Sequence, residues 1–259
     1  MGITFLIVDG LNLVRRIYGA QPGDDGSERV QSAISTSVQS LRRSLKEVAP
    51  THAVAVFDGA QPGWRHQRYP AYKADRPPMP ASLKEGLSSI ADAFSEEGVS
   101  SLSFSELEAD DVIATLAGKV ALKNGRVVIL STDKIFIQLL SDFITVRDHF
   151  QKRDLDRAWV RQKYGVEPER FVDLLALAGD ATNNIPGVPS VGMKTAARLV
   201  SEIGGLETIL ALAHTIPGKT GEMIYRHSEE ARLARDLACL KTDLPLGVNL
   251  KSFRCSLRS

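Results

Sequence analysis

The sequence predicts an α/β fold in which helices flank a mostly parallel central sheet, followed by a smaller helical subdomain. Over the first half of the chain, short apolar runs alternate with segments of helical spacing, which is typical of a parallel sheet with crossover helices. After about residue 150 the apolar runs stop and helical segments punctuated by Gly and Pro continue. The chain has 259 residues, of which 43% are apolar, enough for a substantial core.

The elements follow in order along the chain. Continuous apolar runs at 3–8, 52–57 and 126–131 predict strands covered on both faces, and a short strand is expected near 99–104. Apolar residues at helical spacing predict helices at 28–48 and 82–97, and another that ends near Val120. We therefore expect an α/β core at 1–153, a helical subdomain at 154–240 and a tail without strong signal at 241–259.

Composition limits the classes of protein to which the chain can belong. The net charge of +1 argues against a wholly basic coat protein, although it leaves local basic patches open. No apolar run approaches the roughly 20 residues that span a membrane. Cys239 and Cys255 are the only cysteines, so we expect neither a disulfide framework nor a thiolate zinc site, and a cytoplasmic location.

Three acidic residues follow predicted strands. Asp9 comes directly after the run at 3–8, Asp58 directly after 52–57, and Asp133 two residues after 126–131. The carboxyl ends of parallel strands meet at one edge of a sheet, where ligands bind. A lone Asp is as often a turn former or a helix cap. Three at one edge predict a shared acidic pocket.

The stretch SELEADDVIATLAGKV (105–120) adds Glu108, Asp110 and Asp111 just ahead of an apolar helical run. Like charges about 4 Å apart repel by roughly 1 kcal/mol in water and about 4 kcal/mol at a protein-like dielectric. A helix dipole offers only about 0.3–1 kcal/mol per carboxylate. If the helix begins inside this cluster, all three acids can converge on a divalent cation. Oxygen ligands without His or Cys favour Mg²⁺ or Mn²⁺, and the alternative is a capping cluster on a solvated helix end.

A basic segment follows Asp58. Basic side chains neutralise phosphates and aromatic rings stack on bases, so this segment predicts contact with nucleic acid beside the acidic pocket. An ordinary surface loop is the alternative. Its residues, within 63–80, are Arg65, Arg68, Lys73 and Arg76 with Trp64, Tyr69 and Tyr72 interleaved.

A second phosphate-binding candidate is the turn Gly-Val-Pro-Ser-Val-Gly at 187–192, which leads into a helix that starts near Lys194 or Thr195. Glycines permit close backbone approach, and free N–H groups at a helix start can receive a phosphate oxygen. The segment resembles a helix-hairpin-helix turn, in which backbone carbonyls such as those of Val188 and Val191 often hold a monovalent cation. The alternative is a plain connector between helices.

Taken in order, six motifs resemble the 5′-nuclease (flap endonuclease) family, which includes the N-terminal domain of bacterial DNA polymerase I and stand-alone bacterial proteins of exonuclease IX type. The chain has no polymerase segment, so we expect the stand-alone type. The resemblance implies a PIN-like nuclease core with a basic gateway around 63–97 and a helix-hairpin-helix (H3TH) element at 183–200. The motifs are LIVDGLNLVRR, VFDG, YPAYKADRPPMP, LEADDVIATLA, STDK and LAGDATNNIPGVPSVGMKTAARL.

The resemblance also implies roles for single residues. Lys73 and Arg76 match the gateway residues that steer the scissile phosphate, and Asp133 and Asp180 match acids of a second metal site. Acids matching the first metal site are Asp9, Asp58, Glu108, Asp110 and Asp111. Potassium is expected on backbone carbonyls of Asn183, Val188 and Val191. DNA contacts are expected from Arg65, Arg68, Tyr72, Lys73, Arg76, Lys134, Gly187, Gly192, Lys194 and Thr195.

Two departures weaken the match at the second metal. The family pattern has Asp two residues after Asp133, where this chain has Ile135, and Asp three residues after Asp180, where this chain has Asn183. Isoleucine cannot ligate, and asparagine offers a neutral carbonyl in place of a carboxylate. We therefore expect the second metal to bind weakly or not at all.

Three functions remain open on the sequence. The first is a Mg²⁺-dependent, structure-selective 5′ nuclease, most simply a monomer, that cleaves DNA with 5′ flaps, 5′ overhangs or branches. The second is a protein that binds such DNA with little catalysis, which the substitutions at positions 135 and 183 favour. The third is a small-molecule phosphatase, which leaves the helix-hairpin-helix element unexplained.

Overall fold

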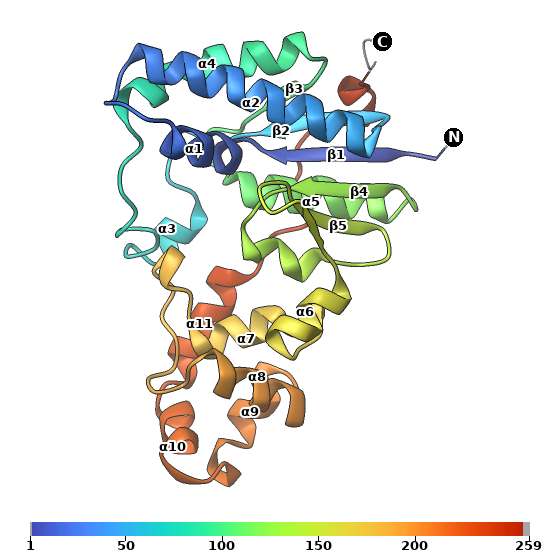
Figure 1. Ribbon diagram of the computed structural model, residues 1–259. Coiled ribbons are helices and arrows are strands. Elements are labelled where there is room, and N and C mark those ends of the chain that lie inside the picture. The colour runs from blue at the N-terminus through green and yellow to red at the C-terminus, as the bar shows by residue number, and fades with distance from the viewer. Residues whose placement is uncertain (1, 256–259) are drawn as a thin grey trace.

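The computed structural model describes residues 2–255 and contains one six-stranded sheet with strand order β3-β2-β1-β4-β5-β6 (Figure 1). All neighbouring strands pair in parallel except β6, which runs antiparallel to β5 at one edge. The predicted mostly parallel sheet flanked by helices is therefore confirmed. The strands are β1 (Thr4–Asp9), β2 (His52–Val56), β3 (Ser100–Leu102), β4 (Arg126–Leu130), β5 (Ile144–Asp148) and β6 (Arg153–Leu155).

Helices cover the sheet and then continue below it as a helical subdomain (Figure 1). Within the described residues, no helix has the length and apolarity needed to cross a bilayer. The α-helices are α1 (Gly10–Ala20), α2 (Ser27–Val48), α3 (Trp64–Arg68), α4 (Ala81–Glu96), α5 (Ala109–Ala121), α6 (Arg157–Tyr164), α7 (Phe171–Ala178), α8 (Met193–Glu202), α9 (Leu206–Ala211), α10 (Gly218–Arg226) and α11 (Ser228–Ala238). Shorter 3₁₀ helices are η1 (Lys134–Leu139), η2 (Pro168–Arg170), η3 (Ala181–Asn183), η4 (Ala213–Thr215) and η5 (Leu250–Phe253).

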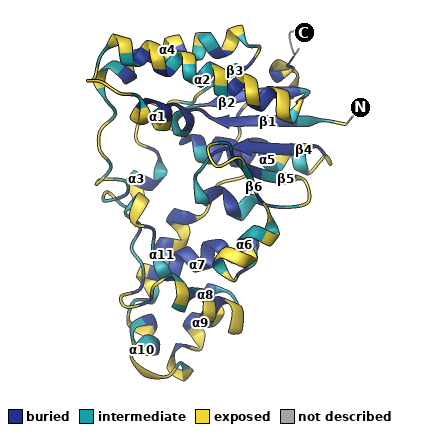
Figure 2. Ribbon diagram, viewed as in Figure 1, coloured by how far each residue is buried: buried dark blue, intermediate teal, exposed yellow. Residues whose placement is uncertain are grey.

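The two faces of the sheet carry separate cores because side chains alternate along each strand. Leu6 and Val8 of β1 face α1, α2 and α4, while Phe5 and Ile7 face α5 and continue into the core of the helical subdomain. Figure 2 shows the buried strands between helices whose outer faces are exposed. Both faces of β1 are therefore dry, as its unbroken apolar run predicts.

Strands β5 and β6 were not predicted. Burial alternates along β5, so its sequence lacks the continuous apolar run that marks the inner strands. β6 spans the predicted boundary between residues 153 and 154, and the division of the chain into two domains stays a prediction.

The C-terminal tail, which carries no strong sequence signal, returns to the α/β core. The Lys241 N–H donates to Asp111 Oδ1 at 3.0 Å, and the Cys255 N–H donates to the Thr51 carbonyl at 3.0 Å. The ring of Phe253 stacks on Phe5 with centroids 5.9 Å apart. The tail thus ties the end of the helical subdomain to the sheet, and residues 256–259 of the predicted tail lie outside the described part.

The side chain of Arg65 is buried, with 1% of its surface exposed, and joins three separate segments. Its guanidinium donates to both oxygens of Asp111 at 2.8 Å and to Glu108 Oε2 at 2.6 Å. It also donates to the carbonyls of Leu237 at 2.7 Å and Cys239 at 2.8 Å. Arg65 therefore cannot contact DNA, which corrects the prediction from sequence, and it fixes α3 and α5 to the end of α11.

Asp111 belongs to the same buried network and not to the acidic pocket. Only 1% of it is exposed, and Trp64 Nε1 donates to its Oδ2 at 2.8 Å in addition to the two bonds from Arg65. Burial alone would lower the pKa of Arg65, but the hydrogen bonds and charge of Asp111, with the charge of Glu108, raise it above its usual range. Both oxygens of Asp111 are bonded within this network and Asp111 does not line the pocket, so the structure gives it a structural role, and its role as a metal ligand stays a prediction.

Replacing Arg65 is expected to destabilise the fold strongly. Arg65→Met keeps most of the side-chain volume but leaves the buried Asp111 without a counter-charge and Glu108 with Lys73 alone, and a broken buried ion pair costs about 3–5 kcal/mol in similar cases. Urea unfolding followed by circular dichroism measures the change. Arg68→Met, on the exposed side of the same helix, is the matched control and should stay within about 0.5 kcal/mol of the parent. Equal stability of the two variants would contradict the role given to Arg65.

Candidate active site at the carboxyl edge of the sheet

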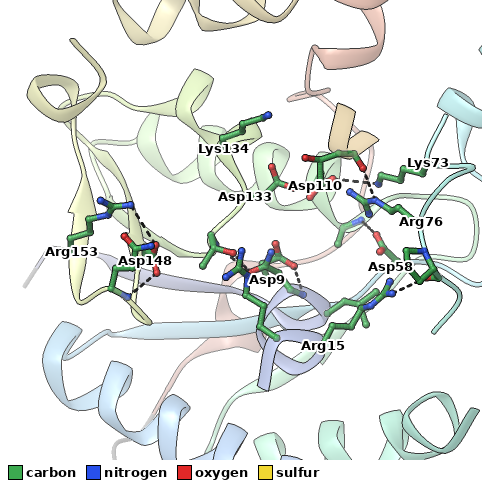
Figure 3. A pocket seen from close by; sticks show the side chains of 18 of the residues that line it. Asp9, Arg15, Asp58, Lys73, Arg76, Asp110, Asp133, Lys134, Asp148 and Arg153 are labelled. Atoms are coloured by element: carbon green, nitrogen blue, oxygen red, sulfur yellow. Dashed lines mark hydrogen bonds and ion pairs between the residues drawn. The ribbon is translucent and has the colours of Figure 1, made fainter. Parts of the chain in front are cut away.

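An open pocket of about 540 Å³ lies at the carboxyl edge of the sheet (Figure 3). The structure brings Asp9, Asp58 and Asp133 to this pocket, as the strand-end pattern predicts, together with Asp110 from the first turn of α5. Lys73, Arg76 and Lys134 line it as well. Further lining residues that the sequence did not single out are Arg15, Arg16, Asp148, Gln151, Arg153, Lys163 and Tyr164.

Short hydrogen bonds set the position of two of these acids. Asp9 caps α1 by accepting from the Asn12 N–H at 3.2 Å, and its other oxygen accepts from Ser131 Oγ at 2.8 Å. Ser131 Oγ in turn accepts from the Asp133 N–H at 3.0 Å. Because Ser131 directly follows β4, it bridges the ends of two adjacent strands and aligns their carboxylates.

The other two acids are placed by the junction of β2 and α5. Asp58 Oδ1 accepts from the Ala109 N–H at 2.8 Å, which caps the start of α5 from the end of β2. Asp110 lies in the first turn of α5, and 18% of its side chain is exposed toward the pocket. Asp110 and Asp111 are adjacent in a helix, so their side chains point in different directions and only Asp110 faces the pocket.

The surroundings of Asp9 and Asp110 disfavour the charged form of both carboxyl groups. Burial is the main cause that raises the pKa of Asp9 to about 7, and the neighbouring Asp133 and Asp58 raise it further. Burial also raises the pKa of Asp110 well above its usual range and outweighs the lowering effect of Lys73, and the charges of Asp133, Asp9 and Asp58 raise it further. Carboxyl groups in this state stabilise an added cation.

Glu108 is held by two cations and does not line the pocket. Lys73 Nζ lies 2.6 Å from Glu108 Oε1 and 3.8 Å from Asp110 Oδ2, while Arg65 binds the other oxygen of Glu108. Burial would raise the pKa of Glu108, but Lys73 and Arg65 lower it overall. Glu108 therefore anchors Lys73 at the pocket rim, in place of the expected role as a metal ligand.

Of the two acids predicted for a second metal, Asp133 lines the pocket and Asp180 does not. Asp180 is 2% exposed, and its oxygens accept from Lys134 Nζ at 2.8 Å and from Asn183 Nδ2 at 2.7 Å. Ile135, which belongs to η1, is buried in the core. Lys134, predicted to contact DNA, is thus paired with Asp180, although it still reaches the pocket wall.

The gateway segment, residues 63–97, docks on η3 of the helical subdomain. The Lys73 N–H donates to the Asn183 carbonyl at 2.9 Å, and Asn184 Nδ2 donates to the Ala71 carbonyl at 2.7 Å. Arg76 donates to the carbonyl of Thr182 and to the side-chain oxygen of Asn183. Both oxygens of Asn183 therefore accept hydrogen bonds from the gateway, and the place of its carbonyl in a potassium site stays a prediction.

The aromatic residues of the gateway are packing residues. Tyr72 is 4% exposed and its ring contacts the His66 ring edge-on, with centroids 5.2 Å apart. Trp64 lies between the cations of Arg65 and Lys241, which are 4.5 and 4.4 Å from its ring centroid. The prediction that Tyr72 contacts DNA is therefore wrong, whereas Arg68 is exposed.

The hairpin at 187–192 packs against α7 at Gly187 and is open to solvent at Gly192. A Cβ on Gly187 would lie 2.5 Å from the Ala178 carbonyl carbon, so this glycine allows close packing on the end of α7. Gly192, which caps α8, has open space around it. The first amides of α8 follow it, and Lys194 and Thr195 reach the surface there. Val188 and Val191 are buried, and the Val188 carbonyl accepts from the Val191 N–H at 3.0 Å.

One pocket acid was missed for a physical reason. Asp148 ends β5 at the same edge as Asp9, so the strand-end rule would have found it had the alternating pattern of β5 been recognised. Asp148 accepts from the Gln151 N–H at 3.1 Å and lies 3.9 Å from Arg153.

A hard divalent cation fits the donors of this pocket. Within residues 2–255, no three ligand-type side chains form a ready-made metal cage. The pocket nevertheless gathers five carboxylates, those of Asp9, Asp58, Asp110, Asp133 and Asp148, with neither His nor Cys, and burial raises the pKa of Asp9 and of Asp110. This donor chemistry suits Mg²⁺ or Mn²⁺, for which carboxylates and water complete the shell.

Comparison with known proteins agrees with this geometry. Residues 4–165 match the N-terminal resolvase-like domain of 5′-3′ exonucleases, and residues 166–258 match their C-terminal SAM fold. The proteins named Flap endonuclease Xni from Photobacterium profundum and Aliivibrio fischeri (strain ATCC 700601 / ES114) are 44% and 41% identical to this chain. Each alignment covers 98% of the chain and 98% or 97% of the relative.

Solved structures show the same fold. The T5 D15 protein crystallised with metal ions superposes with a TM-score of 0.75 at 22% identity, covering 93% of this chain and 90% of that one. The T5 D15 flap endonuclease variant in a complex with DNA and metal ions gives 0.73 at 25% identity, covering 93% and 89%. Both parts of the sequence, its relatives along the whole chain and its fold show that the protein belongs to the 5′-3′ exonuclease family of nucleases.

Proposed function

We propose that the protein is a structure-selective 5′ nuclease that hydrolyses DNA phosphodiesters with Mg²⁺ or Mn²⁺. The observation that carries the proposal is the pocket in which Asp9, Asp58, Asp110 and Asp133 face one space beside Lys73 and Arg76. Acids that hold a cation and bases that hold a phosphate are the two requirements of metal-assisted phosphodiester hydrolysis.

The side chains divide this work between them. Asp9, Asp58, Asp110 and Asp133 would hold the cation. A cation bound there would lower the pKa of an attacking water and polarise the phosphodiester. Lys73, fixed by Glu108, and Arg76, fixed by Asn183, would orient the scissile phosphate over the acids. Arg68, exposed at the end of α3, adds positive charge to the approach.

The helix-hairpin-helix turn would hold the duplex part of the substrate. Phosphate oxygens fit the open start of α8 at Gly192, where free amides combine with Lys194 and Thr195. Carbonyls of Val188 and Val191 would hold K⁺. Substrates would be DNA with 5′ flaps, 5′ overhangs or branches, and the relatives are named flap endonucleases. We further propose a monomer in the cytoplasm, where both free cysteines stay reduced.

The second metal would bind more weakly than the first. Lys134 already neutralises Asp180, and Ile135 and Asn183 offer no carboxylate. The same observations favour an alternative function, the binding of branched DNA with little catalysis. Turnover separates the two, because the alternative predicts K⁺-assisted binding with negligible cleavage at millimolar Mg²⁺.

Asp110→Asn is expected to reduce cleavage of a 5′-flap substrate by at least about 100-fold, because even partners of metal ligands contribute 10- to 100-fold. Single-turnover cleavage in Mg²⁺ measures the loss. Asp75→Asn, an exposed acid of the gateway, is the matched control and should cleave like the parent. Equal cleavage by the Asp110 variant would point to another nuclease in the preparation, and a parent protein that binds but does not cleave would support the alternative.

Thermal stabilisation by Mg²⁺ is expected to be larger at pH 8 than at pH 6. Asp9 has a pKa of about 7 when folded, above the roughly 3.9 of an unfolded Asp, so the metal-free folded state takes up protons in that window. Its contribution to stability is present at low pH and is lost as the pH rises through about 7. Mg²⁺ must displace those protons, so it binds more tightly and stabilises the fold more once they have left. At a concentration of 100 times its Kd, a bound ion stabilises the folded state by about 2.7 kcal/mol in total.

Differential scanning fluorimetry at the two pH values measures this effect. Asp75→Asn should keep the full Mg²⁺ response, whereas Asp110→Asn should lose most of it. A rise in Tm that is the same at both pH values would show that Mg²⁺ binds elsewhere.

Asn183→Asp is expected to strengthen the second metal site. The new carboxylate faces Asp180, so the metal-free variant should be less stable than the parent, and a second Mg²⁺ should appear in calorimetric titration. Asn184→Asp adds the same charge one residue away, where the side chain faces Ala71, and should leave the metal stoichiometry unchanged. An unchanged stoichiometry in the Asn183 variant would contradict the weakened site.

A further inference from the structure

The pocket has a second cationic wall, opposite Lys73 and Arg76. Arg16 of α1, Arg153 of β6 and Lys163 of α6 line the same space as the four acids. Figure 3 shows Arg153 beside Asp148 on the far side of Asp9 from Lys73 and Arg76. The acidic centre therefore lies between two groups of cations from different elements of the fold.

These cations are largely free of acidic partners. Among the side chains that the structure describes, none of the acids forms an ion pair with Arg16 or Lys163, and the only one with Arg153 is Asp148, at the long distance of 3.9 Å. The arginines of α6, the helix that carries Lys163, are paired: both Arg157 and Arg161 form ion pairs with Glu167. On this helix, the side chains away from the pocket are neutralised and the one that lines the pocket is not.

Aromatic rings hold the wall in place without cancelling its charge. Lys163 Nζ lies 4.6 Å from the ring centroid of Trp159 and 5.3 Å from that of Tyr164. The guanidinium of Arg153 lies 5.0 Å from the centroid of the same Trp159 ring. Cation–π contacts restrict a cation but leave its charge and its hydrogen-bond donors available to an anion.

A ligand that satisfies both walls must carry more than one negative charge along its length. A single phosphate bound at Lys73 and Arg76 leaves the opposite wall unpaired, whereas a polynucleotide strand carries a charge on every linkage. We propose that Arg16, Arg153 and Lys163 bind a neighbouring phosphate of the DNA strand whose scissile phosphate lies at Lys73 and Arg76. This inference rests on the proposed function, and it assigns a phosphate contact to the β5–β6 hairpin and α6.

The first test measures DNA affinity of the double variant Arg153→Gln, Lys163→Gln. Binding to a 5′-flap duplex is followed by fluorescence anisotropy, with Ca²⁺ in place of Mg²⁺, over a series of salt concentrations. Loss of the contact to this one phosphate should weaken binding about tenfold or more and make the slope of log K against log salt shallower by roughly 0.7–0.9. Lys152→Gln is the matched control, because Lys152 neighbours Arg153, is exposed and does not line the pocket. It should change neither affinity nor slope.

The second test identifies the phosphate. Single methylphosphonate linkages, which are neutral, are placed one at a time along the flap strand near the cleavage position. In the parent protein, the neutral linkage at the contacted phosphate weakens binding. In the double variant, that same linkage should have no further effect, whereas the linkage at the scissile phosphate should still weaken binding.

The outcomes separate this inference from the proposed nuclease function. The second phosphate contact would be contradicted, even if the parent cleaves DNA normally, by either of two results. One is that every methylphosphonate weakens binding by the same factor in the parent and in the double variant, and the other is that Lys152→Gln loses as much DNA affinity as the double variant. If the parent protein does not cleave DNA but the methylphosphonate effect at the contacted phosphate disappears in the double variant, the proposed activity is contradicted and the second phosphate contact is supported. If the double variant does not fold, Lys163→Gln alone is tested in the same scan, since its side chain is exposed and makes only ring contacts.

Discussion

The acidic start of α5 is folded around the guanidinium of Arg65. Without that cation, the buried Asp111 would have no counter-charge and Glu108 would keep only Lys73, and a buried unpaired carboxylate is costly. Arg65 binds both and also donates to carbonyls at the end of α11, so the same contact closes the helical subdomain onto the core. The remaining acid of the cluster, Asp110, is thereby left to face the pocket.

The acids behind the pocket are therefore paired with cations, whereas those that face it are not fully neutralised. Arg65 and Lys73 neutralise the buried acids behind the rim, while Asp9 and Asp110 keep raised pKa values in front of it. A group whose charged form is disfavoured by its surroundings gains most from a bound cation. The strain of bringing strand-end acids together is therefore the source of affinity for a divalent ion, and it is held by strands buried on both faces.

Much of this arrangement can be read from the sequence, and the rest depends on partners far away in the chain. The apolar runs at 3–8, 52–57 and 126–131 predict the inner strands, and the acids after them predict the pocket edge. Helical geometry separates Asp110 from Asp111, but their roles depend on Arg65, which lies 46 residues before Asp111. Likewise, the pairing of Asp180 with Lys134 follows from packing of η1 against the helical subdomain, which no local pattern encodes.

The contact between the gateway and η3 joins the two places where DNA is expected to bind. Lys73 and Arg76 are bonded through backbone and side chain to residues 182 and 183, only a few positions before the hairpin that packs on α7. The Lys73 backbone adopts a φ of 56°, a left-handed conformation that a lysine rarely takes without such support. A hairpin seated on duplex DNA would therefore fix the position of the gateway cations relative to the acids. Selection for DNA structure and alignment of the scissile phosphate then depend on one set of contacts, because the same residues serve both.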